Sequence, residues 1–404
     1  MAEIRRLDAG NILQLYKIHT MVFNLRRDYS KEDEQKTDPL AHPAEWALGI
    51  FDGNKLLAGT FDLEYLMRFD GHSVKMSGIS GVATLPEARN EGFVRKILER
   101  LLIENYEKGV IFSNLTPFDH GFYRKFGYET ACARTHISIN TGDMSDIESD
   151  GKFVQIFPGD DTSLLAEVHG AYIADINHGI HRDSWPDNRA WKRFTREDPC
   201  TSGYFTYLWK DKNGKARSYI KFQDVTEDGD HNMNVTELAF TDKEGLYGAL
   251  SLAGILSPQF ENFKWLAPTF IEPFDIISDP WSVETEIRPR DMTRVINVKA
   301  ALELMRRPCG GGSGQYVIEV EDENIEANCQ KFLVEFESNE TKVTPTKKNA
   351  DISCDILTLS QLITGYRSFE SAVYTRREGF EVHGNEKTLK RVFTLRPQHI
   401  TEYF

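Results

Sequence analysis

Apolar and polar positions in the first third of the chain follow two periods in turn, which predicts alternating strands and helices. The strand-like runs lie at 46–51, 56–63, 75–84 and 110–115. Residues 11–25 and 93–108 carry apolar side chains at helical spacing. The polar turn at 52–55 joins the first two strands into a hairpin. This order predicts a mixed α/β unit.

The rest of the chain divides into two further units. An Asp-rich polar stretch at 142–152 marks a boundary. Beyond it the pattern repeats, with expected helices at 164–176 and 244–257 and strands at 204–209, 216–225 and 263–267. The last part has expected helices at 295–305, 359–365 and 387–393 and strands at 315–320, 331–337 and 351–357. We therefore expect domains at 1–145, 146–286 and 287–404.

The turn that follows the strand-like run 75–84 carries the most specific signal. It contains Arg89-x-x-Gly92, and the helix-like segment from Phe93 starts directly after it. The free N–H groups at the start of a helix attract anions, and a glycine lets the backbone come close to a phosphate. The second unit has no such turn after a strand, which suggests a degenerate copy of the first. The Arg89-x-x-Gly92 turn of the first unit therefore predicts a pyrophosphate site.

Composition and charge limit the classes of function. The chain has 404 residues, with 40% hydrophobic and 27% charged residues, which is ordinary for a folded protein of two or three domains. The net charge of −14 argues against binding nucleic acid and is compatible with a cationic substrate. We expect no membrane span and, from the N-terminal residues, a cytoplasmic protein. The five cysteines form no C-x-x-C pair, so we expect no metal site.

The Arg-x-x-Gly turn, followed by a strand and then by Phe122-Tyr123-Arg124-Lys125-Phe126-Gly127, resembles the GCN5-related N-acetyltransferases (GNAT). The usual sixth position of that turn is Gly or Ala, and here it is Val94. Bulky residues there are found in the enhanced-intracellular-survival (Eis) type. The run from Arg290 to Leu302 also resembles the start of the third domain of that type. The resemblance implies tandem GNAT-like domains, a sterol-carrier-protein-like C-terminal domain and a homohexamer.

The resemblance also assigns the cofactor site. It implies that acetyl-CoA binds with its thioester oxygen near the backbone N–H of Val82, while Ala83 and Thr84 run along the pantetheine arm. Backbone N–H groups of the turn would then surround the pyrophosphate. The residues of this turn are Arg89, Asn90, Glu91, Gly92, Phe93, Val94 and Arg95.

The same resemblance names two groups that move protons. Tyr123 holds the family's place for the acid that protonates the departing thiolate, and Tyr128 is its rival. His120 is a candidate shuttle. In Eis-type enzymes the α-carboxylate of the last residue enters the active site, and here that residue is Phe404. Such a carboxylate would hold the ammonium and accept its proton.

The acceptor is expected to be a cationic primary amine, such as an aminoglycoside, a polyamine or a lysine side chain. Phe23 and Trp46 are candidate apolar walls, and Asp28 and Glu402 are candidate negative charges. Two alternatives stay open at this point. One is a longer-chain N-acyltransferase, and the other is a CoA-binding regulator or lipid carrier without turnover.

Overall fold

The computed structural model describes residues 2–24, 42–227, 229–306, 308, 312–337, 340–375 and 379–404. Its contacts group the chain into two units. The first comprises Met1–Cys132, Asp291–Arg396 and Glu402–Phe404, and the second comprises Ala133–Arg290 and Pro397–Thr401. The three-domain division stays a prediction.

The first unit contains a mixed sheet whose strands lie in the order β1, β2, β3, β4, β5 and β12. These strands are β1 (Glu3–Arg6), β2 (Ala47–Asp52), β3 (Lys55–Phe69), β4 (His72–Thr84), β5 (Phe112–Leu115) and β12 (Glu284–Val295), of which β12 belongs to this unit from Asp291 on. Only the β4–β5 pair is parallel, and the other pairs are antiparallel. The predicted hairpin and the predicted mixed α/β class are confirmed.

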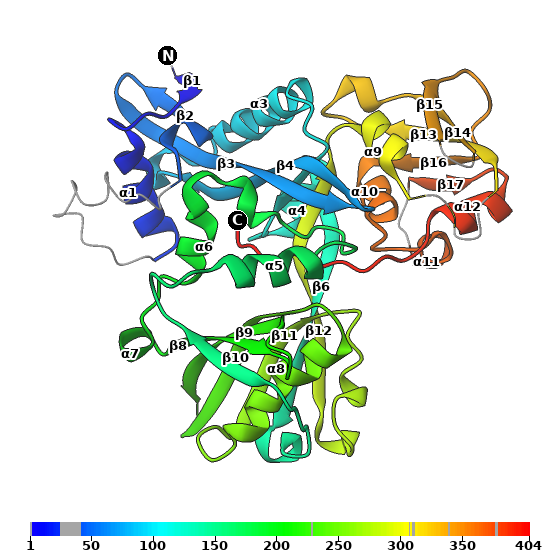
Figure 1. Ribbon diagram of the computed structural model, residues 1–404. Coiled ribbons are helices and arrows are strands. Elements are labelled where there is room, and N and C mark those ends of the chain that lie inside the picture. The colour runs from blue at the N-terminus through cyan, green and yellow to red at the C-terminus, as the bar shows by residue number, and fades with distance from the viewer. Residues whose placement is uncertain are drawn as a thin grey trace. The chain divides into compact units, whose positions relative to one another are not determined.

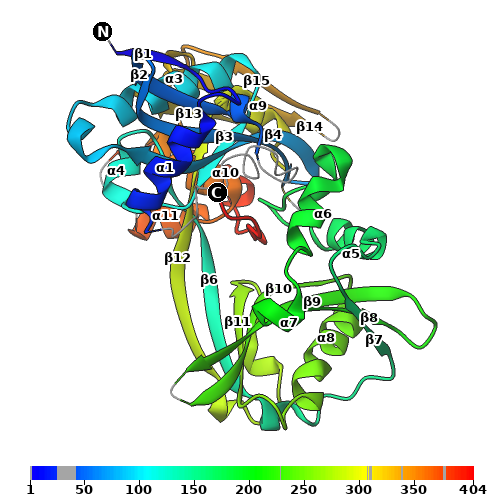
Figure 2. The same cartoon turned by 90° about the vertical axis from the view of Figure 1, so that its left-hand side faces the viewer.

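Helices α1 (Ile12–Val22) and α3 (Phe93–Glu107) cover opposite faces of this sheet (Figures 1 and 2). Leu15 of α1 lies against Gly59, whereas the neighbouring Ala58 belongs to the core on the α3 side. Adjacent residues of a strand point to opposite faces, so the two contacts place the two helices. The α3 stripe buries Ile97, Leu98, Leu101 and Leu102, which is the spacing that the sequence indicated.

The first unit also contains a five-stranded sheet in the order β15, β14, β13, β16 and β17. These strands are β15 (Glu340–Pro345), β14 (Lys331–Glu337), β13 (Gly314–Glu321), β16 (Ile352–Asp355) and β17 (Phe380–Val382). The helices of this part are α9 (Val298–Leu304), α10 (Ile356–Thr364), α11 (Phe369–Thr375) and α12 (Glu386–Val392).

The second unit contains a sheet in the order β6, β11, β10, β9, β8 and β7. Its strands are β6 (Glu129–Asn140), β11 (Asn262–Pro268), β10 (Asp230–Phe240), β9 (Ala216–Glu227), β8 (Tyr204–Lys210) and β7 (Lys152–Ile156), of which β6 belongs to this unit from Ala133 on. Its helices are α5 (Ser163–Tyr172), α6 (Arg189–Phe194), α7 (Pro199–Ser202) and α8 (Lys243–Ile255). Helix α8 joins β10 to a parallel β11, as α3 joins β4 to a parallel β5.

Two sequence expectations for elements are wrong. Val295 ends strand β12 instead of starting a helix, and the helix begins at Val298. The end of β12 pairs with β5, from Met292 opposite Leu115 to Val295 opposite Phe112, and this long-range partner holds it extended. Residues 351–357 likewise divide between β16 and α10, because Asp355 caps the helix by accepting from the Thr358 N–H.

Candidate active site

Strand β4 separates from β5 where the resemblance places the thioester. The parallel pairing runs from Met76–Phe112 to Ile79–Leu115 and stops there. The pairing of β4 with β3 continues to Thr84 opposite Ala58, across a bulge between the Phe61–Ser80 and Gly59–Ala83 pairs. The splayed end of β4 thus has backbone groups that β5 does not satisfy.

The turn before α3 presents backbone N–H groups to an anion. Asn90 and Gly92 have left-handed φ values of 68° and 71°, and no side chain of a described residue caps the helix at Gly92. The first N–H groups of α3 therefore keep no intrahelical partner. A Cβ built at Gly92 meets nothing within 4 Å, so the space in front of the turn is open. The arrangement fits a diphosphate.

A cavity of about 740 Å³ connects the turn with the splayed strand. Nine of the ten predicted cofactor residues line it, and Glu91 does not. The lining includes three cations, Arg89, Arg95 and Lys125, and no carboxylate. Lys125 was not predicted as a site residue, although it lies inside the motif that contains Tyr123. The charge of the lining favours an anionic ligand.

Tyr123 and Tyr128 are both buried but differ in the hydrogen bonding of their hydroxyl groups. Tyr123 lies in α4 (His120–Arg124), whose first turn is held by the Asp119 carboxylate accepting from the Phe122 N–H at 2.5 Å. The Tyr123 hydroxyl has no hydrogen bond to another described residue. The Tyr128 hydroxyl lies 2.7 Å from the Ser113 hydroxyl. Tyr123 therefore keeps a free donor, whereas Tyr128 is satisfied in the core.

Burial raises the pKa of Tyr123 above its ordinary value, and the nearby Tyr128 adds to the effect. Burial also raises the pKa of Tyr128 to about 12, against the opposing hydrogen bond from Ser113. Both phenols are thus protonated at neutral pH. His120, the candidate shuttle, has a buried Nε2 atom without a hydrogen-bond partner among the described residues.

The last residues of the chain have defined contacts. Pro397–Thr401 group with the second unit, where the His399 ring nitrogens bond the Tyr172 hydroxyl at 2.7 Å and the Arg134 guanidinium. Glu402–Phe404 group with the first unit. There the Phe404 ring meets the Tyr65 ring edge-on, with centroids 5.6 Å apart, and covers Gly78 of β4.

The predicted acceptor residues are less clearly assembled. Phe23 lines the cavity and is 44% exposed. Trp46 and Glu402 are half-buried and are not part of the cavity lining. Asp28 lies outside the described residues. The cavity thus unites nine of the cofactor residues and Phe23, but its lining does not include Tyr123, and the roles of all four predicted acceptor residues stay predictions.

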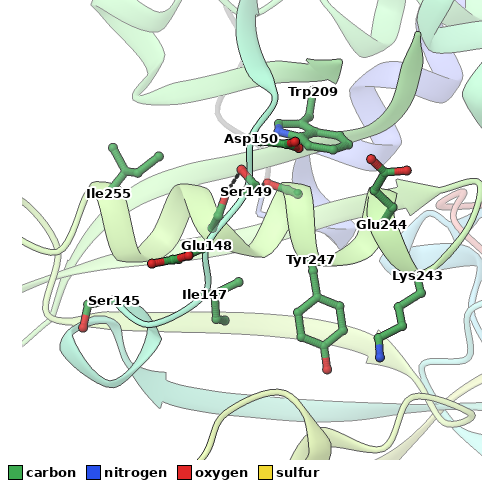
Figure 3. Close-up of a pocket in the computed structure, with 12 residues that line it drawn as sticks. Ser145, Ile147, Glu148, Ser149, Asp150, Trp209, Lys243, Glu244, Tyr247 and Ile255 are labelled. Atoms are coloured by element: carbon green, nitrogen blue, oxygen red, sulfur yellow. Dashed lines mark hydrogen bonds between the residues drawn. The ribbon is translucent and has the colours of Figure 1, made fainter. Parts of the chain in front are cut away.

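A second cavity, of about 930 Å³, lies in the second unit beside α8 (Figure 3). Its labelled carboxylates are Glu148, Asp150 and Glu244. The start of α8 is capped by Asp242, which accepts from the Gly245 N–H at 2.9 Å. Asp242 thus occupies an N–H group of the kind that α3 leaves open, and the three carboxylates of the lining outnumber its one cation, Lys243, so the cavity disfavours a diphosphate. The larger cavity is therefore the poorer candidate for CoA.

Two further features bear on cofactors and membranes. Within the described ranges, no cluster of His, Cys, Asp or Glu side chains is arranged to hold a metal ion. No helix of the described part of the chain combines the length and the apolar character needed to cross a bilayer.

Comparison with known families and structures assigns two parts of the chain. The acetyltransferase (GNAT) domain family matches residues 3–131. The sterol carrier protein domain family matches residues 298–401. Comparison with curated proteins gives no significant match.

Solved structures share the fold over the whole chain. A probable N-acyltransferase from Enterococcus faecalis has a TM-score of 0.85 at 20% identity, with 100% of both chains covered. A GCN5-related N-acetyltransferase from Anabaena variabilis gives the same values. Eis1 from Mycobacterium abscessus has a TM-score of 0.79 at 18% identity, also with 100% of both chains covered. At such identities the likeness shows the fold.

The fold is thus a mixed α/β architecture with a GNAT domain and a sterol-carrier-like domain, as predicted. The protein carries a GNAT acetyltransferase domain and is an enzyme of the N-acetyltransferase class. GNAT domains use acetyl-CoA, which agrees with the chemistry of the cavity beside α3.

Proposed function

We propose that the protein is an Eis-type enzyme that transfers an acetyl group from acetyl-CoA to a primary amine of a cationic acceptor. The observation that carries this proposal is the single cavity that joins the open N-terminus of α3 to the splayed end of β4. A diphosphate at one end and a thioester at the other need these two kinds of backbone site.

The cofactor residues have separate roles in this proposal. N–H groups of the turn 89–95 hold the diphosphate, and Arg89, Arg95 and Lys125 add charge-assisted bonds. The Val82 N–H donates to the thioester oxygen and stabilises the negative charge that develops there during attack. Ala83 and Thr84 line the path of the pantetheine arm.

The proton transfers use Tyr123 and the end of the chain. The amine nitrogen attacks the thioester carbon, and the C–S bond then breaks. Tyr123 gives its hydroxyl proton to the departing thiolate, and the Phe404 α-carboxylate accepts the proton that the amine loses. A neutral Tyr123 and an ionised carboxylate are the forms that this step requires.

The acceptor is proposed to be an aminoglycoside, a polyamine or a lysine side chain. Phe23 and Trp46 would contact its apolar parts, and Asp28 and Glu402 would attract its charges. The net charge of −14 supports a cationic acceptor. The homohexamer that the Eis resemblance implies belongs to the same proposal and can be measured by sedimentation velocity.

The test combines binding and turnover on the full chain. CoA affinity is measured by calorimetry, and thiol release is followed with acetyl-CoA and a panel of aminoglycosides, spermidine and Nα-acetyl-lysine. Turnover on at least one amine is expected. CoA binding without thiol release on any amine would favour the regulator. Faster turnover with a long-chain acyl-CoA than with acetyl-CoA would favour the longer-chain acyltransferase.

A further inference from the structure

His19 of α1 contacts the bulge of β4, and neither the sequence pattern nor the family match assigns it a role. Its Nε2 atom lies 2.7 Å from the Gly81 carbonyl oxygen. A carbonyl only accepts, so Nε2 carries the proton and donates. His19 is 9% exposed, and its ring packs against the rings of Phe23 and Phe61 with centroids 5.4 and 6.3 Å apart. The ring is therefore fixed where it meets Gly81.

The bulge is shaped to receive this ring. Gly81 has a left-handed φ of 64°, and a Cβ at this position would lie 2.7 Å from the His19 ring. The backbone conformation and the space thus both require glycine. The preceding carbonyl, of Ser80, accepts from the Thr60 hydroxyl at 2.9 Å. Two successive carbonyls of the bulge are therefore held by side chains.

The Gly81 carbonyl and the Val82 N–H belong to the same peptide unit. The described chain contains no cis peptide bond, so the C=O and N–H of this planar unit point in opposite directions. Fixing the carbonyl toward His19 fixes the Val82 N–H away from it. A hydrogen bond to the carbonyl also polarises the peptide and strengthens the N–H as a donor.

We propose that His19 is a positioning residue that orients and polarises the peptide unit donating to the thioester oxygen. This inference rests on the proposed function, in which that donor is the Val82 N–H. His19 touches neither the reacting atoms nor the acceptor amine in this proposal. It acts through the Gly81–Val82 peptide bond.

The test measures the thioester bond directly. The carbonyl stretch of [1-¹³C]acetyl-CoA is recorded by isotope-edited infrared difference spectroscopy on the full chain, without acceptor. In the wild type the bound carbonyl should absorb at lower frequency than free acetyl-CoA. His19→Phe, which keeps an aromatic ring but no donor, should move the band back toward the free value.

The kinetic readout separates positioning from general damage. Losing a whole oxyanion donor costs on the order of 10²–10³ in kcat, and a misaligned donor should cost about tenfold. We expect this loss in His19→Phe, with the KM for acetyl-CoA nearly unchanged. His19→Gln should recover most of the band shift and of kcat, because its amide nitrogen takes the place of Nε2. His72→Phe removes an exposed imidazole at the start of β4 and should behave as wild type.

The outcomes distinguish the inference from the function. A wild-type band at the free frequency, or no turnover on any amine, would contradict the proposed function. A wild-type shift that His19→Phe retains in full would overturn the role of His19. Should His19→Phe fail to fold by near-UV circular dichroism, His19→Asn decides in its place, because its shorter side chain keeps polarity but does not reach the Gly81 carbonyl.

Discussion

Tyr123 and Tyr128 are two buried phenols with ring centroids 6.2 Å apart, and a single hydrogen bond separates their roles. Ser113 satisfies Tyr128, whereas the Tyr123 hydroxyl bonds no other described residue, which suits its proposed donation to the thiolate. The sequence put Tyr123 in the family's place for the acid and kept Tyr128 as its rival, because Tyr128 directly follows the same motif. The hydroxyl environments agree with this preference, and the role of Tyr123 as the acid stays a proposal.

Tyr123→Phe should lower kcat by roughly 10²-fold or more, because the thiolate then leaves without a proton donor. The KM for acetyl-CoA should change little, since the cavity lining does not include Tyr123. Steady-state kinetics with the best acceptor of the panel measures both quantities. An unchanged kcat would indicate that water or Tyr128, rather than Tyr123, protonates the thiolate.

The pH profile tests the same assignment. The acid works in its protonated form, and its pKa is raised above the ordinary value of about 10. Tyr123 should therefore cause no loss of kcat as the pH rises toward 10. The matched control is Tyr128→Phe, which removes one buried hydrogen bond and should cost about 1 kcal/mol of unfolding free energy while kcat stays near wild type.

At the scale of elements, α3 and α8 occupy corresponding places in the two sheets. The capping and the charges at their N-termini differ. The α3 start has an open glycine and neighbouring arginines, whereas the α8 start has an aspartate cap. Arg217 bonds the Asp211 and Asp242 carboxylates at 2.7 and 2.6 Å, so its charge is neutralised there. The N-terminus of α3 thus favours an anion, whereas the capped N-terminus of α8 does not.

Gly92→Asp should weaken CoA binding by at least tenfold, because it places a carboxylate where the diphosphate belongs. The measurement is calorimetric titration with CoA. Gly109→Asp is the matched control at the other end of α3. Both glycines have a φ of 71° and open space for a Cβ, so the backbone strain is the same in both variants. Equal CoA affinity of the two variants would show that the turn is not part of the CoA-binding site.

The sequence predicted the elements whose signals are local. The turn, α3, strand β2 and the start of β3 lie within one or two residues of their expected positions, because glycine, periodicity and turn residues specify them, whereas β3 continues to Phe69, six residues beyond its expected end. Strand β10 was not predicted, and the first residue of the expected helix at 295 proved to be strand. These strands depend on partners far away in the chain, which no local pattern reveals.

The site residues, too, divide into those that a local sequence pattern predicts and those that only tertiary packing brings together. The cofactor residues follow one another in the sequence, and nine of them line one cavity. His19 and Lys125 were not predicted as site residues. His19 reaches Gly81 from 62 positions away, and only the packing of α1 on β4 brings the two together. A bulge and its support are tertiary features, so a single sequence cannot display them.

At the scale of the whole molecule, the end of the chain links distant parts of the sequence. His399 is 3% exposed and hydrogen-bonded at both ring nitrogens. Burial lowers its pKa well below the ordinary value, and the charge of Arg134 adds to this, so the ring stays neutral at physiological pH. Five residues further on, the Phe404 ring sits on Gly78 and Tyr65. The tail is therefore held at His399 and at the Phe404 ring, while Tyr403 between them is exposed.

This packing allows the charge of the tail to be tested apart from its position. A semisynthetic protein with a C-terminal amide keeps the Phe404 ring and its contacts but loses the carboxylate. We expect kcat to fall by about 10²-fold, since the ammonium then has no group to take its proton. Extending the chain by Gly-Ser-Gly-Ser should give a similar loss, while the same four residues added at the N-terminus should have no effect. CoA affinity should be equal in all four proteins. An amide with the kcat of the wild type would remove the terminal carboxylate from the reaction while leaving Tyr123 and the CoA cavity in place.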